Sequence, residues 1–236
     1  MNLILFEPGA FVLSSNDERY RHLKEILKKG EGDTFAAGIV NGMKGTASIE
    51  SMDEKECVCR FEPQTESPPL FDLTLIIGMV RPITARRLLK DLTAMGVGRI
   101  WFVQTELTDK SYRAGSLWKE ENYRKFLIEG AVQAGETRLP EIAVPYSLRS
   151  ALEKLSPEEP RFVFDNRPNA VSFRQQSAFL LPATAAVGSE RGWTDNERRL
   201  FADYGFSVYA LGERILRTET AAAAAAALIL ERGGCW

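Results

Sequence analysis

Apolar runs in the second two-thirds of the chain alternate with segments of helical spacing. The runs are short enough for buried strands, and between them apolar positions recur every three or four residues, as in amphipathic helices. This alternation predicts an α/β domain, with a parallel sheet covered by helices on both faces. The predicted strands are Leu73–Val80, Ile100–Gln104, Ile142–Val144, Phe162–Phe164, Ala183–Val187 and Ser207–Leu211. The predicted helices are Thr84–Met95, Trp118–Ala134, Leu148–Leu155, Asp195–Tyr204 and Thr220–Glu231, and Thr194 with Glu197 predicts a capping box at the start of Asp195–Tyr204.

The first sixty residues follow a different, β-rich pattern. Asn41-Gly42 predicts a tight hairpin turn, and Asn16–Lys28 has helical spacing with Asn16 or Asp17 as a cap. The proline-containing stretch Pro63–Asp72 is typical of a linker. We therefore expect a small β domain over residues 1–64 and the α/β domain over residues 72–236. The predicted strands of the small domain are Met1–Phe6, Thr34–Val40, Gly45–Ile49 and Glu56–Phe61.

Two polar, glycine-containing turns follow predicted strands near the end of the chain. The first is Gly188-Ser189-Glu190-Arg191-Gly192, and the second, Leu211–Thr220, runs into seven alanines. The carboxyl ends of parallel strands meet at one edge of a sheet, so the two turns predict a ligand crevice there. Their spacing is not that of a dinucleotide fingerprint, and no Gly-Lys-Ser or Gly-Lys-Thr is present, which argues against NAD or ATP held in the usual way.

The same two turns carry a family resemblance. Gly-x-Glu-x-Gly followed by Leu-Gly-x-Arg-Ile-Leu-Arg-Thr-Glu-Thr-Ala resembles the small-subunit ribosomal RNA uridine N3-methyltransferases (RsmE type) of the SPOUT class, and Leu211–Ala221 fits without a gap. Ser189 and Arg191 depart from the family's usual Gly-Pro-Glu-Gly-Gly. The resemblance implies a PUA-like β-barrel before a SPOUT domain with a trefoil knot. It also implies S-adenosylmethionine as cofactor.

The cofactor site is expected at the two turns. Leu211, Ile215 and Leu216 are suited to wall an adenine, while nearby backbone amides read its edge. Taken alone, the first turn is equally compatible with a plain strand-to-helix connection, and the alanine run with a generic helix of high propensity. The expected cofactor-binding residues are Gly188, Ser189, Glu190, Gly192, Leu211, Gly212, Ile215, Leu216, Arg217 and Thr218.

The implied chemistry needs alignment and a proton acceptor more than a strong nucleophile, because a sulfonium carries its own activation. His22 is the only histidine and falls in the small domain, so a carboxylate or water would take the N3 proton. Glu190 and Glu219 are the candidates, and Arg217 could offset charge on the uracil oxygens. A single histidine excludes a histidine-built zinc site, and no metal is expected.

The charge distribution indicates where RNA would bind. The net charge of −2 argues against indiscriminate coating of nucleic acid, but residues 81–113 carry seven basic side chains against three acidic ones. This excess predicts either an RNA-facing patch, through Arg86 and Arg87, or an ordinary solvated helix face. In the small domain, Arg21, His22 and Lys28 resemble part of the family's RNA-binding signature.

The expected function follows from the resemblance: methylation of N3 of a uridine in small-subunit ribosomal RNA by a homodimer. Two alternatives stay open. One is an RNA-binding ribosome-assembly factor that lost turnover, motivated by Ser189, Arg191, Val132 and Glu136; the other is a SPOUT enzyme acting on another RNA, such as transfer RNA. No apolar run or leader predicts a membrane span or export, so a cytoplasmic protein is expected, with half-buried reduced thiols at Cys57 and Cys59.

Overall fold

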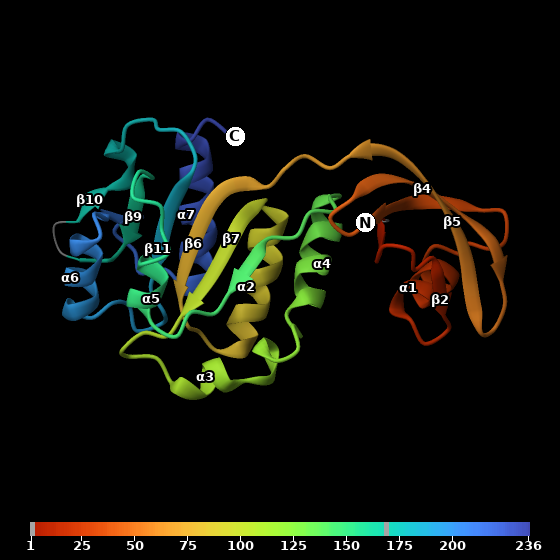
Figure 1. The fold of residues 1–236 in the computed structure, drawn as a ribbon, viewed down its shortest axis with the longest axis horizontal. Coiled ribbons are helices and arrows are strands. Elements are labelled where there is room, and N and C mark those ends of the chain that lie inside the picture. Colours follow the sequence, from red (N-terminus) through yellow and green to blue (C-terminus); the bar gives the residue numbers. More distant parts are fainter. Residues whose placement is uncertain (1–2, 168–169) are drawn as a thin grey trace. The chain divides into compact units, whose positions relative to one another are not determined.

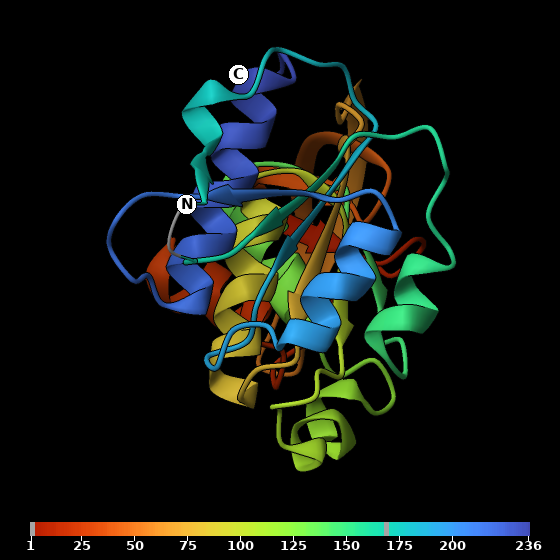
Figure 2. The same cartoon turned by 90° about the vertical axis from the view of Figure 1, so that its left-hand side faces the viewer.

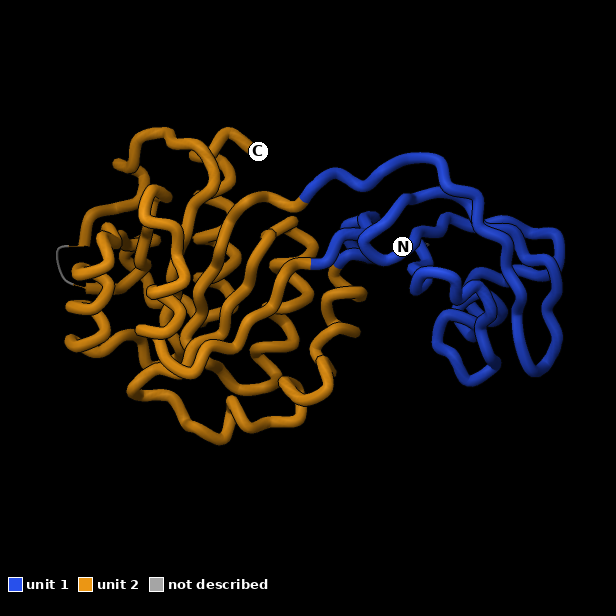
Figure 3. The backbone as a smooth tube through the Cα atoms, viewed as in Figure 1, with its two compact units in different colours: residues 1–69, 131–139 blue, residues 70–130, 140–236 orange. Residues whose placement is uncertain are grey.

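The chain forms two compact units (Figure 3). The computed structural model describes residues 3–167 and 170–236, so Met1 and Asn2 of the first predicted strand lie outside the described residues. Unit 1 comprises Met1–Pro69 and Ala131–Leu139, and unit 2 comprises Leu70–Gly130 and Pro140–Trp236. The return of residues 131–139 to unit 1 has no counterpart in the sequence pattern.

Unit 1 is a curled five-stranded sheet in the order β1-β3-β4-β5-β2 (Figure 1). Its pairs are antiparallel except β1 with β3. Its core includes both Cys57 and Cys59, which are buried rather than half-buried as expected. Burial raises the pKa of the Cys59 thiol to about 12. The strands are β1 (Ile4–Phe6), β2 (Val12–Ser14), β3 (Thr34–Ile39), β4 (Met43–Met52) and β5 (Glu56–Glu66).

Local signals in unit 1 have mixed outcomes. The hairpin at Asn41-Gly42 is confirmed, since β3 and β4 pair antiparallel across it. Asp17 is the helix cap, but the helix is only α1 (Glu18–Arg21) and a π-helical turn (His22–Ile26). The predicted linker Pro63–Asp72 is wrong at its start, because β5 continues through Pro63 to Glu66, but the boundary between the units, after Pro69, falls within it. Pro63 is tolerated because β2 pairs only with the start of β5 and the β4 register shifts nearby.

Hydrogen bonds hold the returning segment within unit 1. The buried Thr137 hydroxyl donates its hydrogen to the Gly42 carbonyl at 2.6 Å. It also lies 2.8 Å from the Ser67 hydroxyl, and because the Thr137 hydrogen is already used, Ser67 is the donor of this second bond. Asn41 N donates to the Thr137 carbonyl at 2.9 Å. Glu136 forms an ion pair with Lys44 at 2.7 Å. Glu136 thus has a structural role.

Unit 2 contains a seven-stranded parallel sheet in the order β10-β12-β9-β11-β6-β7-β8. This arrangement confirms the predicted parallel α/β architecture. The central strand β11 is buried along its whole length, as expected for a strand covered on both faces. The strands are β6 (Phe71–Gly78), β7 (Val97–Val103), β8 (Glu141–Ala143), β9 (Arg161–Phe164), β10 (Val171–Ser172), β11 (Ala183–Val187) and β12 (Ser207–Ala210).

Helices cover both faces of this sheet (Figure 2). Helices α2 (Pro82–Ala94) and α7 (Thr218–Arg232) pack together on one face, with α7 also against β6 and β11. Helices α5 (Leu148–Leu152) and α6 (Asp195–Asp203) share a core with side chains of the opposite face. The predicted capping box of α6 is confirmed: Thr194 and Glu197 exchange side chain-to-backbone hydrogen bonds.

The predicted helix Trp118–Ala134 is wrong in its first part. The chain instead forms α3 (Lys110–Ala114), a short 3-10 helix (Ser116–Trp118) and then α4 (Arg124–Ala134). Glu120 and Glu121 adopt φ angles of 48° and 53°, which a right-handed helix does not permit. None of the described helices is long and apolar enough to cross a membrane.

Replacing Thr137 by valine should lower the free energy of unfolding by about 1–3 kcal/mol. Valine keeps the shape of the side chain but lacks the hydroxyl, so the Gly42 carbonyl and the Ser67 hydroxyl each lose a buried hydrogen-bond partner. Urea denaturation would measure the change. Thr65→Val, on the exposed part of β5, is the matched control and should change stability by less than about 0.5 kcal/mol. Equal stability of the two variants would show that the hydroxyl does not anchor the segment.

Candidate functional site

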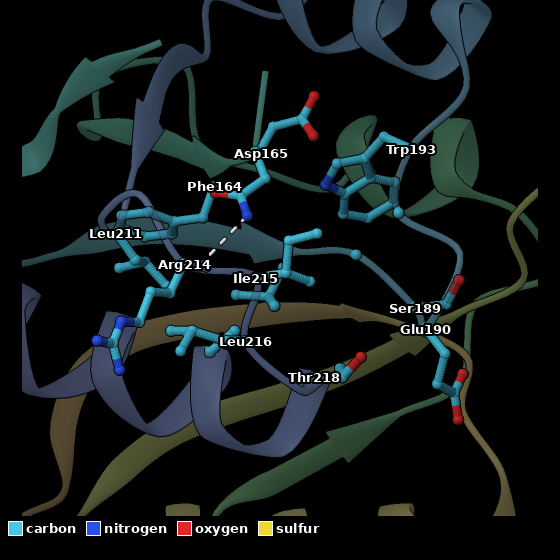
Figure 4. A pocket seen from close by; sticks show the side chains of 15 residues that line it. Phe164, Asp165, Ser189, Glu190, Trp193, Leu211, Arg214, Ile215, Leu216 and Thr218 are labelled. Carbon is cyan, nitrogen blue, oxygen red and sulfur yellow. Dashed lines mark hydrogen bonds between the residues drawn. The ribbon is translucent and has the colours of Figure 1, made fainter. Parts of the chain in front are cut away.

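A cavity opens where the predicted crevice should lie, at the carboxyl ends of β9 and β11 and beside the loop after β12 (Figure 4). We call it the first cavity. It confirms that the two turns singled out in the sequence come together in space. The lining residues are Phe164, Asp165, Asn166, Val187, Gly188, Ser189, Glu190, Gly192, Trp193, Leu211, Arg214, Ile215, Leu216, Thr218 and Ala221.

The Gly188–Gly192 segment, here called the glycine turn, closes on itself. Gly192 N donates to the Ser189 carbonyl at 2.9 Å, and Gly192 has a φ of 69°. A Cβ added to Gly188 would lie 2.9 Å from the Gly192 Cα, closer than real Cβ atoms approach. Gly78, at the end of β6, is tighter still, since its Cβ would lie 2.5 Å from Ser189 N. The shape of the turn therefore requires glycine at three positions.

Trp193 follows the glycine turn and was not among the residues singled out in the sequence. Its side chain is buried and packs edge-on against Phe201, with ring centroids 4.8 Å apart. Figure 4 shows its indole nitrogen directed toward the interior of the first cavity. Its position directly after the turn was the signal in the sequence that could have identified it.

Three more lining residues, Phe164, Asp165 and Asn166, come from the end of β9. Because Phe162–Phe164 was a predicted strand, the rule that ligands bind at strand ends could have identified Asp165 and Asn166. Asp165 Oδ2 accepts a 2.6 Å hydrogen bond from Arg198 Nε, and this bond is the main cause that raises the pKa of Arg198. Asn166 Nδ2 donates to the Arg214 carbonyl at 3.4 Å, which connects β9 to the loop after β12.

The loop of residues 211–217 forms the apolar wall of the first cavity. Ile215 is 90% exposed and Leu216 is 37% exposed, which is unusual for large aliphatic side chains and suits a surface that a ligand covers. Thr218, at the start of α7, is buried. Gly212 and Arg217 are not among the described lining residues. Gly212 has a φ of 152° and open space around it, so a substitution there would act through backbone strain.

The proposed acid–base residues lie in different surroundings. Glu190 is exposed, lines the first cavity and accepts a long hydrogen bond, 3.4 Å, from Arg81 N. Glu219 lies on α7 in a 3.7 Å ion pair with Arg87 and is not among the described lining residues. Arg217 is the N-cap residue of α7 and makes no side-chain capping bond. Of these residues, Glu190 is the one placed to meet a ligand.

A second cavity adjoins the first, because Ser189 and Glu190 line both. It is lined mostly by charged and hydroxyl-bearing side chains. Hydrogen bonding to Tyr112, followed by the charges of Tyr112 and Glu190, raises the pKa of Arg81. The lining residues are Arg81, Glu106, Leu107, Thr108, Asp109, Tyr112, Ser189, Glu190 and Arg191.

The basic candidates belong to two surfaces. On α2 of unit 2, Arg86 and Arg87 are exposed, and the Arg86 guanidinium lies 5.5 Å from the Phe126 ring centroid. In unit 1, Arg21 and Lys28 are exposed and His22 is half-buried. All of these side chains except His22 are thus open to solvent for phosphate contacts.

Comparisons with known proteins show the family and the fold of the chain. A family model described as RNA methyltransferase domain matches residues 66–230. Ribosomal RNA small subunit methyltransferase E of Treponema pallidum is 39% identical over 247 residues, and the match covers 100% of this chain and 93% of the relative. Ribosomal RNA small subunit methyltransferase E 1 of Borreliella burgdorferi is 36% identical over 231 residues, and the match covers 95% of each chain. The crystal structure of ribosomal RNA small subunit methyltransferase E from Neisseria gonorrhoeae, bound to S-adenosyl methionine, has the same fold, with a TM-score of 0.79, 22% identity, and coverage of 98% of this chain and 97% of that one.

Gly188→Ala should distort the glycine turn, because the added Cβ forces the Gly192 backbone to move. We expect a loss of about 1–3 kcal/mol in the free energy of unfolding and an altered near-ultraviolet circular dichroism signal from the adjacent Trp193. Gly30→Ala, where the Cβ meets open space, is the control and should alter neither quantity. An unchanged signal and unchanged stability for Gly188→Ala would contradict the close backbone approach.

Proposed function

Because the chain belongs to the RNA methyltransferase domain family, we propose that it uses S-adenosylmethionine to methylate N3 of a uridine in small-subunit ribosomal RNA. The observation that carries this proposal is the meeting of two cavities at Ser189 and Glu190, at the carboxyl edge of a parallel sheet. One cavity is mainly walled by apolar side chains and the other is polar. Two adjoining cavities are what a transfer between a cofactor and an acceptor base requires.

The first cavity is proposed as the cofactor site. Leu211, Ile215 and Leu216 would cover the faces of the adenine, and their exposure to water would end on binding. The glycine turn would bring its backbone close to the ligand, together with the side chains of Ser189 and Glu190. When bound, S-adenosylmethionine supplies a methyl group on a sulfonium, which needs no further activation.

The second cavity is proposed to receive the acceptor uracil, which must leave its stack to be methylated. A new bond would join N3 to the methyl carbon as the sulfur–methyl bond breaks, and the Glu190 carboxylate would take the N3 proton. Arg81 would donate hydrogen bonds to the uracil oxygens, where negative charge develops. Arg81 thereby takes the role for which Arg217 was the expected residue.

Other contacts support Glu190 over Glu219 as the proton acceptor. Glu219 is held in an ion pair with Arg87 and is not among the described residues that line either cavity. Glu190 is exposed and accepts a long hydrogen bond from Arg81 N, so its oxygens are open to a ligand. Glu190 also lines both cavities, where the base and the methyl group would meet.

Glu190→Gln should lower the rate constant for methyl transfer to unmodified small-subunit ribosomal RNA by about 10²- to 10⁴-fold. Its affinity for S-adenosylmethionine should stay within about threefold, because the amide keeps the shape of the side chain. Single-turnover assays with labelled cofactor would measure the rate, and calorimetry the affinity. Glu219→Gln is the matched control and should retain most of the rate.

The opposite ranking of the two glutamine variants would contradict the assignment of Glu190. A parent protein that binds both RNA and cofactor yet never transfers a methyl group would support the assembly-factor alternative. Methylation of transfer RNA but not ribosomal RNA would support the second alternative.

RNA would bind through both units. We propose that unit 1 is PUA-like and contacts phosphates through Arg21, His22 and Lys28, and that Arg86 and Arg87 of unit 2 make phosphate contacts of their own. The active species is proposed to be a homodimer that forms through unit 2. The chain of unit 2 is also proposed to form a trefoil knot at the 211–217 loop and α7. Small alanine side chains on α7 would allow the close packing that both features demand.

Replacing Arg86 and Arg87 together by glutamine should weaken RNA binding and make its dependence on salt shallower. For two lost phosphate contacts, the slope of log K against log salt should change by about 1.4–1.8. Filter binding across a salt series would measure it. The control is Arg149→Gln with Arg199→Gln, which removes the same charge from exposed positions on α5 and α6, on the opposite face of the sheet. Identical slopes for the two double variants would show that α2 is a solvated face.

A further inference from the structure

Trp193 presents a buried hydrogen-bond donor to the first cavity. Its side chain is 2% exposed, and among the residues that the structure describes no atom accepts a hydrogen bond from its indole nitrogen. Figure 4 shows this nitrogen directed between Asp165 and Ile215 into the cavity. Buried donors in folded proteins almost always have a partner, and an indole N–H can only donate. The missing partner must therefore carry a lone pair.

Packing fixes the direction of this donor. The Trp193 ring lies edge-on against Phe201, at 4.8 Å between centroids and an interplanar angle of 76°. The rest of the indole belongs to the core between the sheet and helices α5 and α6. Its nitrogen is also close to the glycine turn, 3.5 Å from the position that a Cβ on Gly188 would take. The N–H is thus held toward the cavity without a hydrogen bond of its own.

The surroundings select the kind of acceptor. Asp165 and Glu190 bring negative charge to the lining, which disfavours a ligand carboxylate near the indole. Among the described lining residues Arg214 is the one cation, and its guanidinium points away from Trp193 (Figure 4). Phe164 adds an aromatic wall suited to a purine. A neutral ring nitrogen or ribose oxygen fits these surroundings better than a charged group.

We propose that Trp193 is a ligand-binding residue that donates a hydrogen bond to an acceptor atom on the adenosine half of S-adenosylmethionine. This inference rests on the proposed cofactor site and adds to it a residue with a defined chemical role. A hydrogen bond from Trp193 to the ligand would be lost on removal of the donor, so binding should weaken. A tryptophan that serves packing alone would not lose such a bond.

The chain contains a matched control. Trp101 is also buried, its indole nitrogen likewise has no partner among the described residues, and its ring belongs to the same core as Trp193. Trp101 is not among the described lining residues of the first cavity. Replacing either tryptophan by phenylalanine removes a donor and part of a ring from one core, but only Trp193→Phe removes a donor that faces the ligand.

The test compares the two phenylalanine variants in the full-length protein. Trp193→Phe should weaken binding of S-adenosylmethionine about 3- to 10-fold by calorimetry, as expected for one hydrogen bond. The same loss should appear with 5′-methylthioadenosine, which lacks the amino-acid half. The melting temperatures of the two ligand-free variants should be similar, because each variant loses a donor and part of a ring from the same core. Trp101→Phe should bind both ligands as tightly as the parent.

A second measurement uses the parent protein alone and so does not depend on whether a variant folds. In ¹H–¹⁵N spectra of the parent, assigned by triple-resonance methods, the indole N–H signal of Trp193 should move downfield on addition of either ligand, while that of Trp101 stays in place. A stationary Trp193 signal, or undiminished affinity of Trp193→Phe, would overturn the inference and leave the proposed function intact. A loss with S-adenosylmethionine but not with 5′-methylthioadenosine would overturn the adenosine assignment. A parent that binds neither ligand would refute the proposed function itself.

Discussion

Both cavities depend on a close approach of backbone to backbone at the carboxyl edge of the sheet. Gly78 ends β6 against Ser189, and Gly188 lies against Gly192 within the glycine turn. Without side chains at these positions, the turn can lie directly on the end of the sheet, so Ser189 and Glu190 border the first cavity on one side and the second on the other. A side chain at Gly78 or Gly188 would collide with the backbone of the turn, and one at Gly192 would strain its φ of 69°.

Ion pairs and hydrogen bonds engage three acidic side chains of unit 2 in the structure, whereas Glu190 remains exposed to a ligand. Asp165 is paired with Arg198, and Glu219 with Arg87. The Glu197 carboxylate is buried and accepts hydrogen bonds from two backbone amides, Glu106 N and Thr194 N. These three carboxylates are engaged in contacts that hold the fold together. The exposed Glu190 differs from them, because it accepts a long hydrogen bond from Arg81 N and lines both cavities, which is why it carries the proposed chemistry.

The sequence predicts well what depends on neighbouring residues. Alternation of apolar runs and helical spacing predicted the parallel sheet, and the Thr194–Glu197 pair predicted a helix start that the structure contains. The two turns were predicted to lie together because parallel strands end at one edge. Residue-level roles were less accessible: Gly212 and Arg217 belong to the right segment but do not line the cavity in the described structure.

What the sequence did not predict depends on contacts between distant residues. Thr137 joins unit 1 through partners at Gly42 and Ser67, which no local pattern connects to it. The direction of the Trp193 indole depends on packing against Phe201. Long-range contacts of this kind follow from the complete fold rather than from propensity.

The proposed activity is the transfer of a methyl group to N3 of a ribosomal uridine. The most direct measurement is nucleoside mass spectrometry of unmodified small-subunit ribosomal RNA, incubated with the purified parent protein and S-adenosylmethionine carrying an isotopically labelled methyl group. The account predicts labelled 3-methyluridine at a single position. Label in another nucleoside, or no label although the protein binds the cofactor, would contradict it.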